Sequence, residues 1–467
     1  MERLSGLDAS FLYTETPTLH MHTLKVGVVD PSTVPGGYSF ERVVDELEKR
    51  LHLLPPFRRR LVTVPFGLHH PVWIEDPDFD LAWHVRRIGC PPPGNHHDFD
   101  QVISDIASTQ LDRTRPLWEI WVVEGLGGGM VGFVAKIHHS LADGVAASAL
   151  LANVMTSDPD EHDPAPPTQR WQPDAVPSRA WLVVGAITSI WRLVLALPSL
   201  MRRTIGGIRA VSGRRRESDV HPPAPFTAPR TSFNTSLTRR RSFATTTLPL
   251  DEVRAVKSAF GVSINDVVLG LTAEVLRDRL EQQGELPDRP LVAGIPVATG
   301  NLDRLSGNAV SNMFTSLRTD IADPVERLHA IHEVTKEAKN LNNLLGADML
   351  VDWNEWAPPK LYALFWRKYS QHGLASRHRP VINCVVSNVA GPRQPLYLAG
   401  ARLVSLYSVG PILEGIGLNV TVWSYLDQLN VSAIACPEHV PDLAGLVESF
   451  NDALAGLSKH AAGHAED

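Results

Sequence analysis

The sequence predicts a mixed α/β fold built from two halves of similar size. The chain has 467 residues, too many for one ordinary hydrophobic core. In both halves, short apolar runs typical of buried strands alternate with amphipathic stretches of helical period. A segment interrupted by proline clusters separates the halves. We therefore predict domains at residues 1–157 and 231–467, joined by a crossover at residues 158–230.

The first half contains a capped helix and a strand–helix pair. Ser39 can cap a helix, because a serine oxygen accepts a hydrogen bond from a free N–H of the first turn. Residues 130–137 are predicted to form a buried strand, and residues 145–155 the helix that follows it. The apolar face of the capped helix carries Phe40, Val43, Val44, Leu47 and Leu51.

The second half alternates in the same way. Residues 263–282 form a predicted helix with one apolar face, and residues 291–297 a strand. Asp323 followed by Pro324 predicts a cap and a first helical position, which open a helix extending to about Leu341. Two further predicted strands occupy residues 384–389 and 418–423. The face of the first helix carries Ile264, Val267, Val268, Leu271 and Val275.

Composition and charge exclude several classes of protein. Hydrophobic residues make up 43% and charged residues 20% of the chain, as in globular proteins. The net charge of -7 argues against nucleic acid as a partner, because phosphate binding requires a basic surface. Three distant cysteines, Cys90, Cys384 and Cys436, predict no disulfide framework. The first residues lack a basic region followed by an apolar run, so we expect no secretory signal and a cytoplasmic location.

The candidate reactive motif is HHSLADG, at residues 138–144, between a predicted strand and a predicted helix. Moving an acyl group from a thioester to an alcohol needs a base for the hydroxyl proton and an acid for the departing thiolate. Histidine can do both near neutral pH. Asp143 can hold the loop or cap the next helix, and Gly144 allows close approach of backbone or ligand. Two core histidines are one alternative. A metal site is another, but the usual HExxH pattern and a nearby cysteine are missing, so we predict no metal.

The motif resembles the HHxxxDG motif of coenzyme A-dependent acyltransferases. The chain is similar nearly end to end to the bacterial wax ester synthase/acyl-CoA:diacylglycerol acyltransferase family. The usual SNVPGP form has Ala390 in place of its proline here. The other matching motifs are LSGLDASFLYTE at residues 4–15, LDRTRPLWE at 111–119, TSFN at 231–234, INDVVLG at 264–270, SGN at 306–308 and SNVAGP at 387–392.

The resemblance implies two chloramphenicol acetyltransferase-like domains with a tunnel between them. The acyl donor would enter the tunnel from one side and the alcohol from the other. His139 would be the general base, with His138 and Asp143 mainly architectural and no covalent acyl-enzyme. The implied partners are long-chain acyl-CoA together with diacylglycerol or a long-chain alcohol. No cofactor is expected, since acyl-CoA is a substrate.

Further motif residues are candidates for substrate contact. Pro116, Leu117 and Trp118 either line the acyl tunnel or pack in the core, and packing is the favoured interpretation. Asn265 and Asp266 lie in the first turn of an apolar helix, where the positive end of the dipole favours an anion. An amide there can stabilise an oxyanion, whereas helix capping is the alternative.

The remaining polar candidates lie in predicted turns and loops. Ser387 and Asn388 precede a glycine-proline turn, and either shape the tunnel or belong to a plain turn. Two histidine pairs sit beside proline and aspartate, and we expect them to be solvated surface groups. The pairs are His69–His70 and His96–His97.

The crossover carries an apolar and basic segment at residues 180–216. Its apolar part, residues 180–201, is nearly long enough to span a bilayer, but Arg192 falls in its middle and Pro198 interrupts it. A central arginine costs about 2.5–3.5 kcal/mol on insertion scales. We therefore predict an interfacial helix on a membrane or lipid droplet, and a helix buried across both domains is the alternative. The arginines are Arg179, Arg192, Arg202, Arg203, Arg209, Arg214, Arg215 and Arg216.

Taken together, these features predict an O-acyltransferase that makes triacylglycerol from acyl-CoA and diacylglycerol. We expect it in the cytoplasm, peripheral on the inner face of the membrane or on lipid droplets. A wax ester synthase acting on long-chain alcohols is the nearest alternative. A catalytically silent lipid-binding or droplet-coating protein is another. A condensation-type domain acting on carrier-bound acyl groups shares the histidine motif but not the other motifs.

Overall fold

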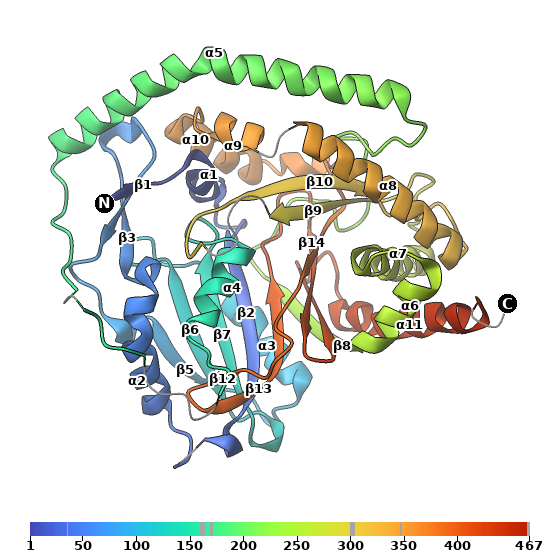
Figure 1. Cartoon of the computed structure of the whole chain (residues 1–467), viewed down its shortest axis with the longest axis horizontal. Helices are drawn as coiled ribbons and strands as arrows, with labels where there is room; N and C mark the ends of the chain where they lie inside the picture. The colour runs from blue at the N-terminus through green and yellow to red at the C-terminus, as the bar shows by residue number, and fades with distance from the viewer. Residues whose placement is uncertain (35, 159–163, 169–170, 299–303, 346–347, 465–467) are drawn as a thin grey trace.

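Two six-stranded mixed sheets and one small sheet form the centre of the structure, a computed structural model (Figure 1). It describes residues 1–467 apart from residues 35, 159–163, 169–170, 299–303, 346–347 and 465–467. Parts of the predicted crossover therefore lie outside the described residues. The α/β prediction is confirmed.

The first large sheet contains the strand that precedes the histidine motif. Its strand order is β12-β13-β2-β7-β6-β5, and β2 pairs antiparallel with both β7 and β13. Residues of the second half therefore supply two strands at one edge of this sheet. The bounds are β2 (His22–Asp30), β5 (Val85–Gly89), β6 (Trp118–Glu124), β7 (Val131–His138), β12 (Tyr397–Leu398) and β13 (Ala401–Val409).

The second large sheet belongs entirely to the second half and has the order β10-β9-β11-β14-β15-β8. Its largest hydrophobic cluster joins the strands to helices α6, α7, α8 and α11. The strands are β8 (Ser242–Pro249), β9 (Val292–Ala298), β10 (Val310–Ser316), β11 (Cys384–Val389), β14 (Leu418–Tyr425) and β15 (Gln428–Ala435). The helices are α6 (Leu250–Phe260), α7 (Ile264–Gln282), α8 (Pro324–Leu345) and α11 (Leu443–His464).

Helix starts follow the capping signals in the sequence. Ser39 accepts the N–H of Arg42 at the start of α2 (Phe40–Arg50). The Ser39 cap is therefore confirmed. Ser263, predicted only as the first helical residue, instead forms a capping box with Asp266 at the start of α7. Asp323 accepts two first-turn N–H groups of α8.

Helix α3 (His96–Ala107) joins the two large sheets. Asp100 of α3 accepts the backbone N–H of Thr245 in β8 at 3.1 Å, and Ser104 accepts that of Phe243 at 2.9 Å. Apolar side chains of α3, β2, β8 and β15 share one core cluster. Side chains of α3 in the first half therefore hydrogen-bond to the backbone of β8 in the second half.

Helix α5 (Arg179–Glu217) runs over both halves as one helix of 39 residues (Figure 1), about 58 Å long. It is long and apolar enough to cross a membrane by length and composition. Only 11% of its most apolar window is buried. The alternative of a helix buried across both domains is therefore wrong. The C-terminal end of α5 is held by Arg214, which donates two hydrogen bonds of 2.8 Å to Glu337 of α8.

The remaining elements surround the histidine motif. Helix α1 (Gly6–Thr14) packs against α9 (Asp348–Asn354) and α10 (Pro359–Gln371). A small sheet of order β1-β4-β3 lies beside α1, with β1 (Glu2–Arg3), β3 (Arg59–Val62) and β4 (Val72–Glu75). Helix α4 (Gly144–Ala152) follows the motif. The three cysteines are buried and free.

Candidate active site

The motif HHSLADG turns the chain from β7 into α4. His138 is the last residue of β7, and its N–H donates to the carbonyl of Leu117 at 2.9 Å. The N–H of His139 donates to the carbonyl of Met21 at 2.7 Å, so the ladder with β2 extends one residue further. The backbone of both histidines is therefore fixed by neighbouring strands.

The imidazole of His139 is oriented by Asn308. Nδ1 of His139 lies 2.8 Å from Oδ1 of Asn308. The amide nitrogen of Asn308 donates to Oδ1 of Asp8 at 2.7 Å and to the carbonyl of His139 at 2.6 Å. Because both amide hydrogens are used in this way, the amide oxygen faces His139 and accepts from Nδ1–H. This tautomer leaves Nε2 as the nitrogen that can take a proton.

The surroundings of His139 favour its neutral form. Burial lowers the pKa of His139, and the charge of Asp143 and the hydrogen bond to Asn308 only partly offset that effect. The ring of Phe11 stacks on the imidazole with centroids 4.3 Å apart. Burial also raises the pKa of Asp8 to about 6, so this carboxylate is ionised at neutral pH. A neutral imidazole with a free Nε2 can act as a general base.

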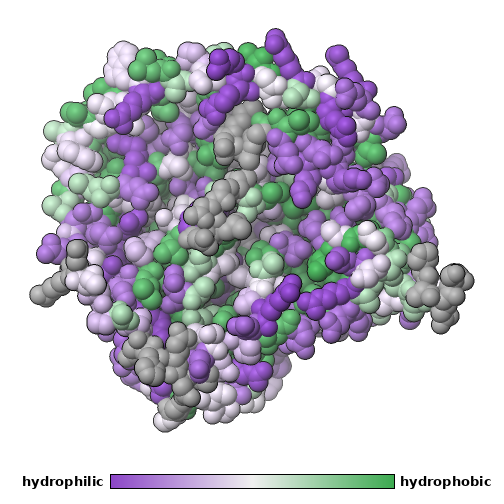
Figure 2. Space-filling model, viewed as in Figure 1, coloured by the Kyte–Doolittle hydropathy of each residue, from purple (hydrophilic) through white to green (hydrophobic). Residues whose placement is uncertain are grey.

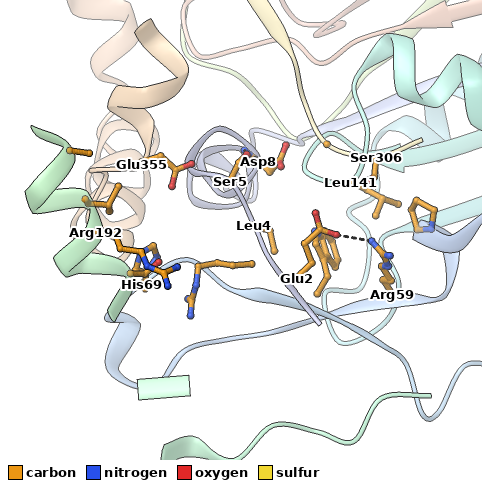
Figure 3. A pocket seen from close by; sticks show the side chains of 17 residues that line it. Glu2, Leu4, Ser5, Asp8, Arg59, His69, Leu141, Arg192, Ser306 and Glu355 are labelled. Atoms are coloured by element: carbon orange, nitrogen blue, oxygen red, sulfur yellow. Dashed lines mark hydrogen bonds and ion pairs between the residues drawn. The ribbon is translucent and has the colours of Figure 1, made fainter. Parts of the chain in front are cut away.

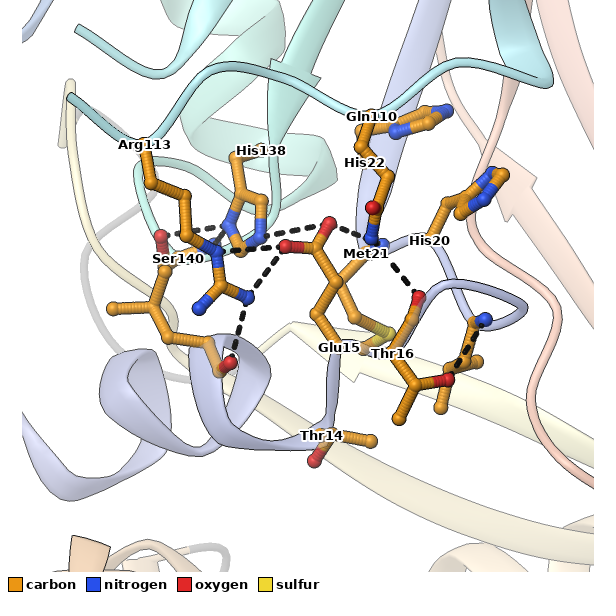
Figure 4. Close-up of polar contacts among 12 residues, drawn as sticks. Thr14, Glu15, Thr16, His20, Met21, His22, Gln110, Arg113, His138 and Ser140 are labelled. Atoms are coloured by element: carbon orange, nitrogen blue, oxygen red, sulfur yellow. Dashed lines mark hydrogen bonds and ion pairs between the residues drawn. The ribbon is translucent and has the colours of Figure 1, made fainter. Parts of the chain in front are cut away.

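His138 lies in a polar network with Glu15, Arg113 and Ser140 (Figure 4). Its Nδ1 accepts the N–H of Ser140 at 3.1 Å and lies 2.7 Å from the hydroxyl of that residue. Nε2 lies 3.7 Å from Oε1 of Glu15. Nε of Arg113 donates to the same carboxylate at 2.8 Å, and the neighbouring His138 and Arg113 hold the pKa of Glu15 well below its usual range. His138 thus ties the motif to the end of α1.

Asp143 fixes the loop rather than contacting His139. Its side chain accepts the N–H groups of Val145 and Ala146, which caps α4. It also pairs with Arg304 and accepts the N–H of Ala309 at 3.0 Å. Hydrogen bonds from Arg304 and from backbone N–H groups keep the pKa of Asp143 below its usual value despite burial. The segment that carries Asn308 is therefore bonded to the motif.

Gly144 does not have the close neighbour that we expected. A Cβ at this position would meet no atom within 4 Å. The alternative of a close protein backbone at Gly144 is therefore wrong, and close approach of a ligand there stays a prediction.

Pro116, Leu117 and Trp118 are all buried beside the motif strand. The Trp118 ring stacks between Phe57 and His84, with centroids 4.3 and 4.4 Å away, and its Nε1 donates to the carbonyl of Phe57. The favoured packing interpretation agrees with this position. A contact of these residues with substrate stays a prediction.

The structure does not bring Asn265, Asp266, Ser387 or Asn388 into the hydrogen-bond network of His139 described above. Asp266 is occupied by its capping box and by Nδ1 of His332 at 2.8 Å. Ser387 and Asn388 lie in β11, paired with Thr421 and Val422 of β14. Roles in substrate contact stay predictions for all four residues.

The surface assignment of His69 and His70 is wrong. Their exposed fractions are 6% and 1%, and His70 lies 2.9 Å from the hydroxyl of Tyr13. The pair precedes β4, and Nε2 of His70 lies 3.3 Å from the carbonyl oxygen of Glu355, just after α9. Burial lowers the pKa of both imidazoles to about 4. His96 and His97 are exposed as expected, although they begin α3 rather than lie in a loop.

Sequence reasoning gave no role to Asp8, Phe11, Asn308 or Arg304. The first three fall inside the family motifs LSGLDASFLYTE and SGN, which were the available signal. Arg304 lies just before the SGN motif and belongs to none of the motifs that predicted functional residues. Their contacts with the histidine motif span long stretches of sequence, and no local pattern encodes such contacts.

A cavity of about 510 Å³ lies between α5 and the motif (Figure 3). Leu141, Gly307 and Asp8 form its inner wall, and Arg192 of α5 lines it from the other side. Arg3, Arg59, Glu2 and Glu355 make it polar. The cavity therefore connects the long helix with the loop that carries His139.

Two family models match parts of both halves of the chain. The family model described as the wax ester synthase/diacylglycerol acyltransferase catalytic domain matches residues 4–268. The WS/DGAT C-terminal domain matches residues 306–458. A Mycobacterium tuberculosis (strain H37Rv) protein provisionally named diacylglycerol O-acyltransferase is 41% identical over 93% of this chain and 92% of its own length. Another from that strain is 37% identical over 98% of this chain and 97% of its own.

Solved structures show the same architecture. The wax ester synthase/diacylglycerol acyltransferase from Marinobacter aquaeolei VT8 aligns with a TM-score of 0.71 and 28% identity, covering 99% of this chain and 100% of that chain. The first condensation domain of the CDA synthetase aligns with a TM-score of 0.58 and 17% identity, covering 98% and 96%. The second likeness shows the fold alone.

The hydrogen bond to Asn308 makes a prediction about the protonation of His139. The pKa of His139 should lie below 6.5. Asn308→Ala should lower it further, because that hydrogen bond stabilises the protonated ring. Nitrogen NMR of histidine-labelled protein, with His139 assigned from a His139→Ala spectrum, measures both. Asn451→Ala, at an exposed asparagine, is the matched control. An unchanged His139 titration in Asn308→Ala would contradict the proposed tautomer.

Proposed function

Because the chain belongs to the wax ester synthase/diacylglycerol acyltransferase family of O-acyltransferases, we propose that it transfers a fatty acyl group from acyl-CoA to the free hydroxyl of diacylglycerol. The product is triacylglycerol, and His139 is the general base. One observation carries this assignment: the Nδ1–H of His139 is held by Asn308, which leaves Nε2 free.

The reaction follows from that tautomer. Nε2 of His139 removes the proton of the hydroxyl while the oxygen attacks the thioester carbonyl carbon. The resulting tetrahedral intermediate collapses, the carbon–sulfur bond breaks, and the imidazolium returns the proton to the thiolate of coenzyme A. The ionised Asp8, reached through Asn308, stabilises the transient positive charge on the ring. No acyl-enzyme forms in this scheme.

The other motif residues have supporting roles. His138 and Asp143 hold the loop through Glu15 and Arg304. Asn265 at the start of α7 is the candidate donor to the oxyanion, because Asp266 already serves the helix cap. Trp118 and its neighbours would support β7, the strand that carries the motif. Ser387 and Asn388 would help to shape the region between the two domains.

A membrane surface is the proposed source of the acceptor. Large apolar side chains of α5 face outward, with exposed fractions of 64% for Trp191 and 78% for Leu195. In Figure 2 apolar and hydrophilic side chains alternate along the upper edge, where α5 runs. The exposed Arg202, Arg209 and Arg216 recur every seven residues and so share one side of the helix. Such a helix lies in the interface of an anionic lipid surface, on the inner face of the membrane or on lipid droplets.

The cavity under α5 is the proposed route for that acceptor. Ser189, Arg192 and Leu193 of α5 line it on one side, and Leu141 of the motif lines it as well. A hydroxyl lipid whose chains remain in the bilayer can present its polar end through this opening. Both diacylglycerol and long-chain alcohols are of this kind.

An acceptor panel tests the proposed function. Purified protein with labelled acyl-CoA should form labelled triacylglycerol from diacylglycerol at a kcat/KM above that for long-chain alcohols. Double-reciprocal plots should intersect, since donor and acceptor are bound together. Preference for alcohols would assign wax ester synthesis instead. Parallel lines with a trappable acyl-enzyme would contradict direct transfer.

Replacing the proposed base gives a second test. His139→Ala should lower kcat by about 10²–10⁴-fold with an unchanged melting temperature. His138→Ala should lower the melting temperature as well as kcat, because it loses Ser140 and Glu15. His97→Ala, at an exposed histidine, is the control. Turnover near that of the unmodified protein in His139→Ala would exclude His139 as the base.

Membrane association can be tested by comparing arginines of α5 that have an ion pair with arginines for which the described residues provide none. Replacing Arg202, Arg209 and Arg216 with glutamine should weaken sedimentation with anionic liposomes, as should raising the salt concentration. Activity on a short soluble alcohol should persist. Arg203 and Arg214 pair with Asp352 and Glu337, so replacing them is the control for helix docking. Unchanged liposome binding at low salt would contradict the interfacial role of α5.

A further inference from the structure

Three arginines of α5 recur every eleven residues, at Arg192, Arg203 and Arg214. Eleven residues make about three turns of an α-helix, so these side chains share one side of α5. Arg203 pairs with Asp352 at 2.8 Å, and Arg214 pairs with Glu337 at 2.8 Å. This side of α5 therefore faces the body of the protein, where carboxylates bind two of the three arginines.

Arg192 is the arginine of this row that lacks such a partner. Within the part of the chain that the structure describes, no carboxylate forms an ion pair with its guanidinium. Arg192 instead lines the cavity of about 510 Å³ under α5, together with Ser189 and Ala196 of the same helix. Small-molecule sites have volumes of roughly 300–1,000 Å³. The cavity is therefore large enough for a ligand that supplies the missing anion.

His69 lines the same cavity and carries an unsatisfied donor. Its Nδ1 accepts the backbone N–H of His70 at 2.7 Å. Burial, and to a smaller extent the charges of His70 and Arg3, lowers the pKa of His69 to about 4, so the ring is neutral near pH 7. Because Nδ1 is an acceptor, the proton of the neutral ring is on Nε2. This buried nitrogen has no hydrogen-bond partner among the described residues, and a ligand oxygen would satisfy it.

Arg3 of β1 is the third donor at this end of the cavity. Its Nη1 donates to the carbonyl of His70 at 2.8 Å. A Cβ on Gly185 would lie 3.3 Å from Nη2 of Arg3, so the guanidinium lies against α5. Gly185 precedes Arg192 by seven residues, or about two turns, and so lies on the same side of the helix. Arg3 also lines the cavity, and the described residues provide no carboxylate in an ion pair with it.

The carboxylates that line the cavity are bonded to other groups. Glu2 pairs with Arg59 at 3.0 Å, and Asp8 accepts from the amide of Asn308 as described above. Glu355 accepts the N–H of Gly6 at the start of α1. Burial raises the pKa of Glu355, which favours its neutral form. These carboxylates therefore do not replace an anion beside Arg192.

The groups without an anionic partner lie away from the main ion pair of the cavity. Figure 3 shows Arg192 and His69 at one end and the Glu2–Arg59 pair toward the other. Two guanidinium groups and one imidazole N–H are all donors, and two of the three are cations. Phosphate oxygens accept several such hydrogen bonds, and the planar guanidinium matches their geometry. A neutral carbonyl would satisfy a donor but would leave both charges uncompensated.

We propose that Arg192, Arg3 and His69 bind a phosphate group, carried by a phospholipid headgroup or present as free phosphate. The headgroup is the source that fits the proposed position of α5 on an anionic lipid surface, because the cavity lies beneath that helix. Bound there, it anchors the inner side of α5, whereas Arg202, Arg209 and Arg216 act from the outer side. No step of the proposed acyl transfer uses these three residues, so the site can be tested independently of the reaction.

Binding to the full-length protein tests the site. Calorimetry in phosphate-free buffer at fixed ionic strength compares dihexanoyl phosphatidic acid, inorganic phosphate and dihexanoylglycerol. The last ligand has the same chains as the first but no phosphate. The unmodified protein should bind the phosphatidic acid, and Arg192→Gln should weaken that binding by about tenfold, the effect of one hydrogen bond to a charged group. Its affinity for dihexanoylglycerol should stay the same.

Arg202→Gln is the matched control, since it removes the same charge from the outer side of α5 and should leave the Kd unchanged. Nitrogen NMR locates the ligand: the Nε2 signal of His69, assigned from a His69→Gln spectrum, should shift until the site is saturated. Equal affinities for inorganic phosphate and phosphatidic acid would assign free phosphate to the site. Tighter binding of the phosphatidic acid would assign the headgroup.

Three results would each overturn the inference. They are no binding of either phosphate ligand, an unmoved His69 signal at saturation, and an equal loss of affinity for phosphatidic acid and dihexanoylglycerol in Arg192→Gln. The last result would mean that Arg192 only maintains the shape of the cavity. Arg192→Lys keeps the charge but loses the planar donors. It should show a smaller loss and provides a second variant if Arg192→Gln does not fold.

Discussion

The hydrogen bond between His139 and Asn308 is the constraint on which the site depends. It brings together three segments that are distant in sequence: α1 through Asp8 and Phe11, the motif after β7, and the residues just before β10. Each segment is anchored separately, by Glu15 with His138 and by Asp143 with Arg304. The imidazole therefore has one tautomer and one orientation, although it lies where two sheets meet.

Buried charge is distributed unevenly around this centre. Asp143, Glu15 and Lys136 each have an oppositely charged partner within 4.0 Å, which offsets the cost of their burial. Lys25 instead has a hydroxyl and an indole face. The paired charges stabilise the loop and strands of the site. Lys25, which has no carboxylate partner among the described residues, lines an apolar cavity instead.

Local signals in the sequence were sufficient for the elements but not for their assembly. Ser39 and the Asp323–Pro324 step predicted helix starts, because capping depends on neighbours within one turn. The general-base role proposed for His139 was inferred by resemblance. The partnership of Asn308 and the burial of His69 and His70 depend on contacts across hundreds of residues. The attachment of β13 to β2 likewise has no local signature, since strand pairing follows from tertiary packing.

That attachment has a consequence for biosynthesis. Strand β2 emerges from the ribosome early, but its partner β13 is translated only near residue 401, which is tens of seconds later at ordinary elongation rates. Until then the edge of β2 exposes unpaired backbone groups that can recruit other strands. The nascent chain is consequently vulnerable to aggregation during this interval. Expression of the first half alone would make that vulnerability permanent.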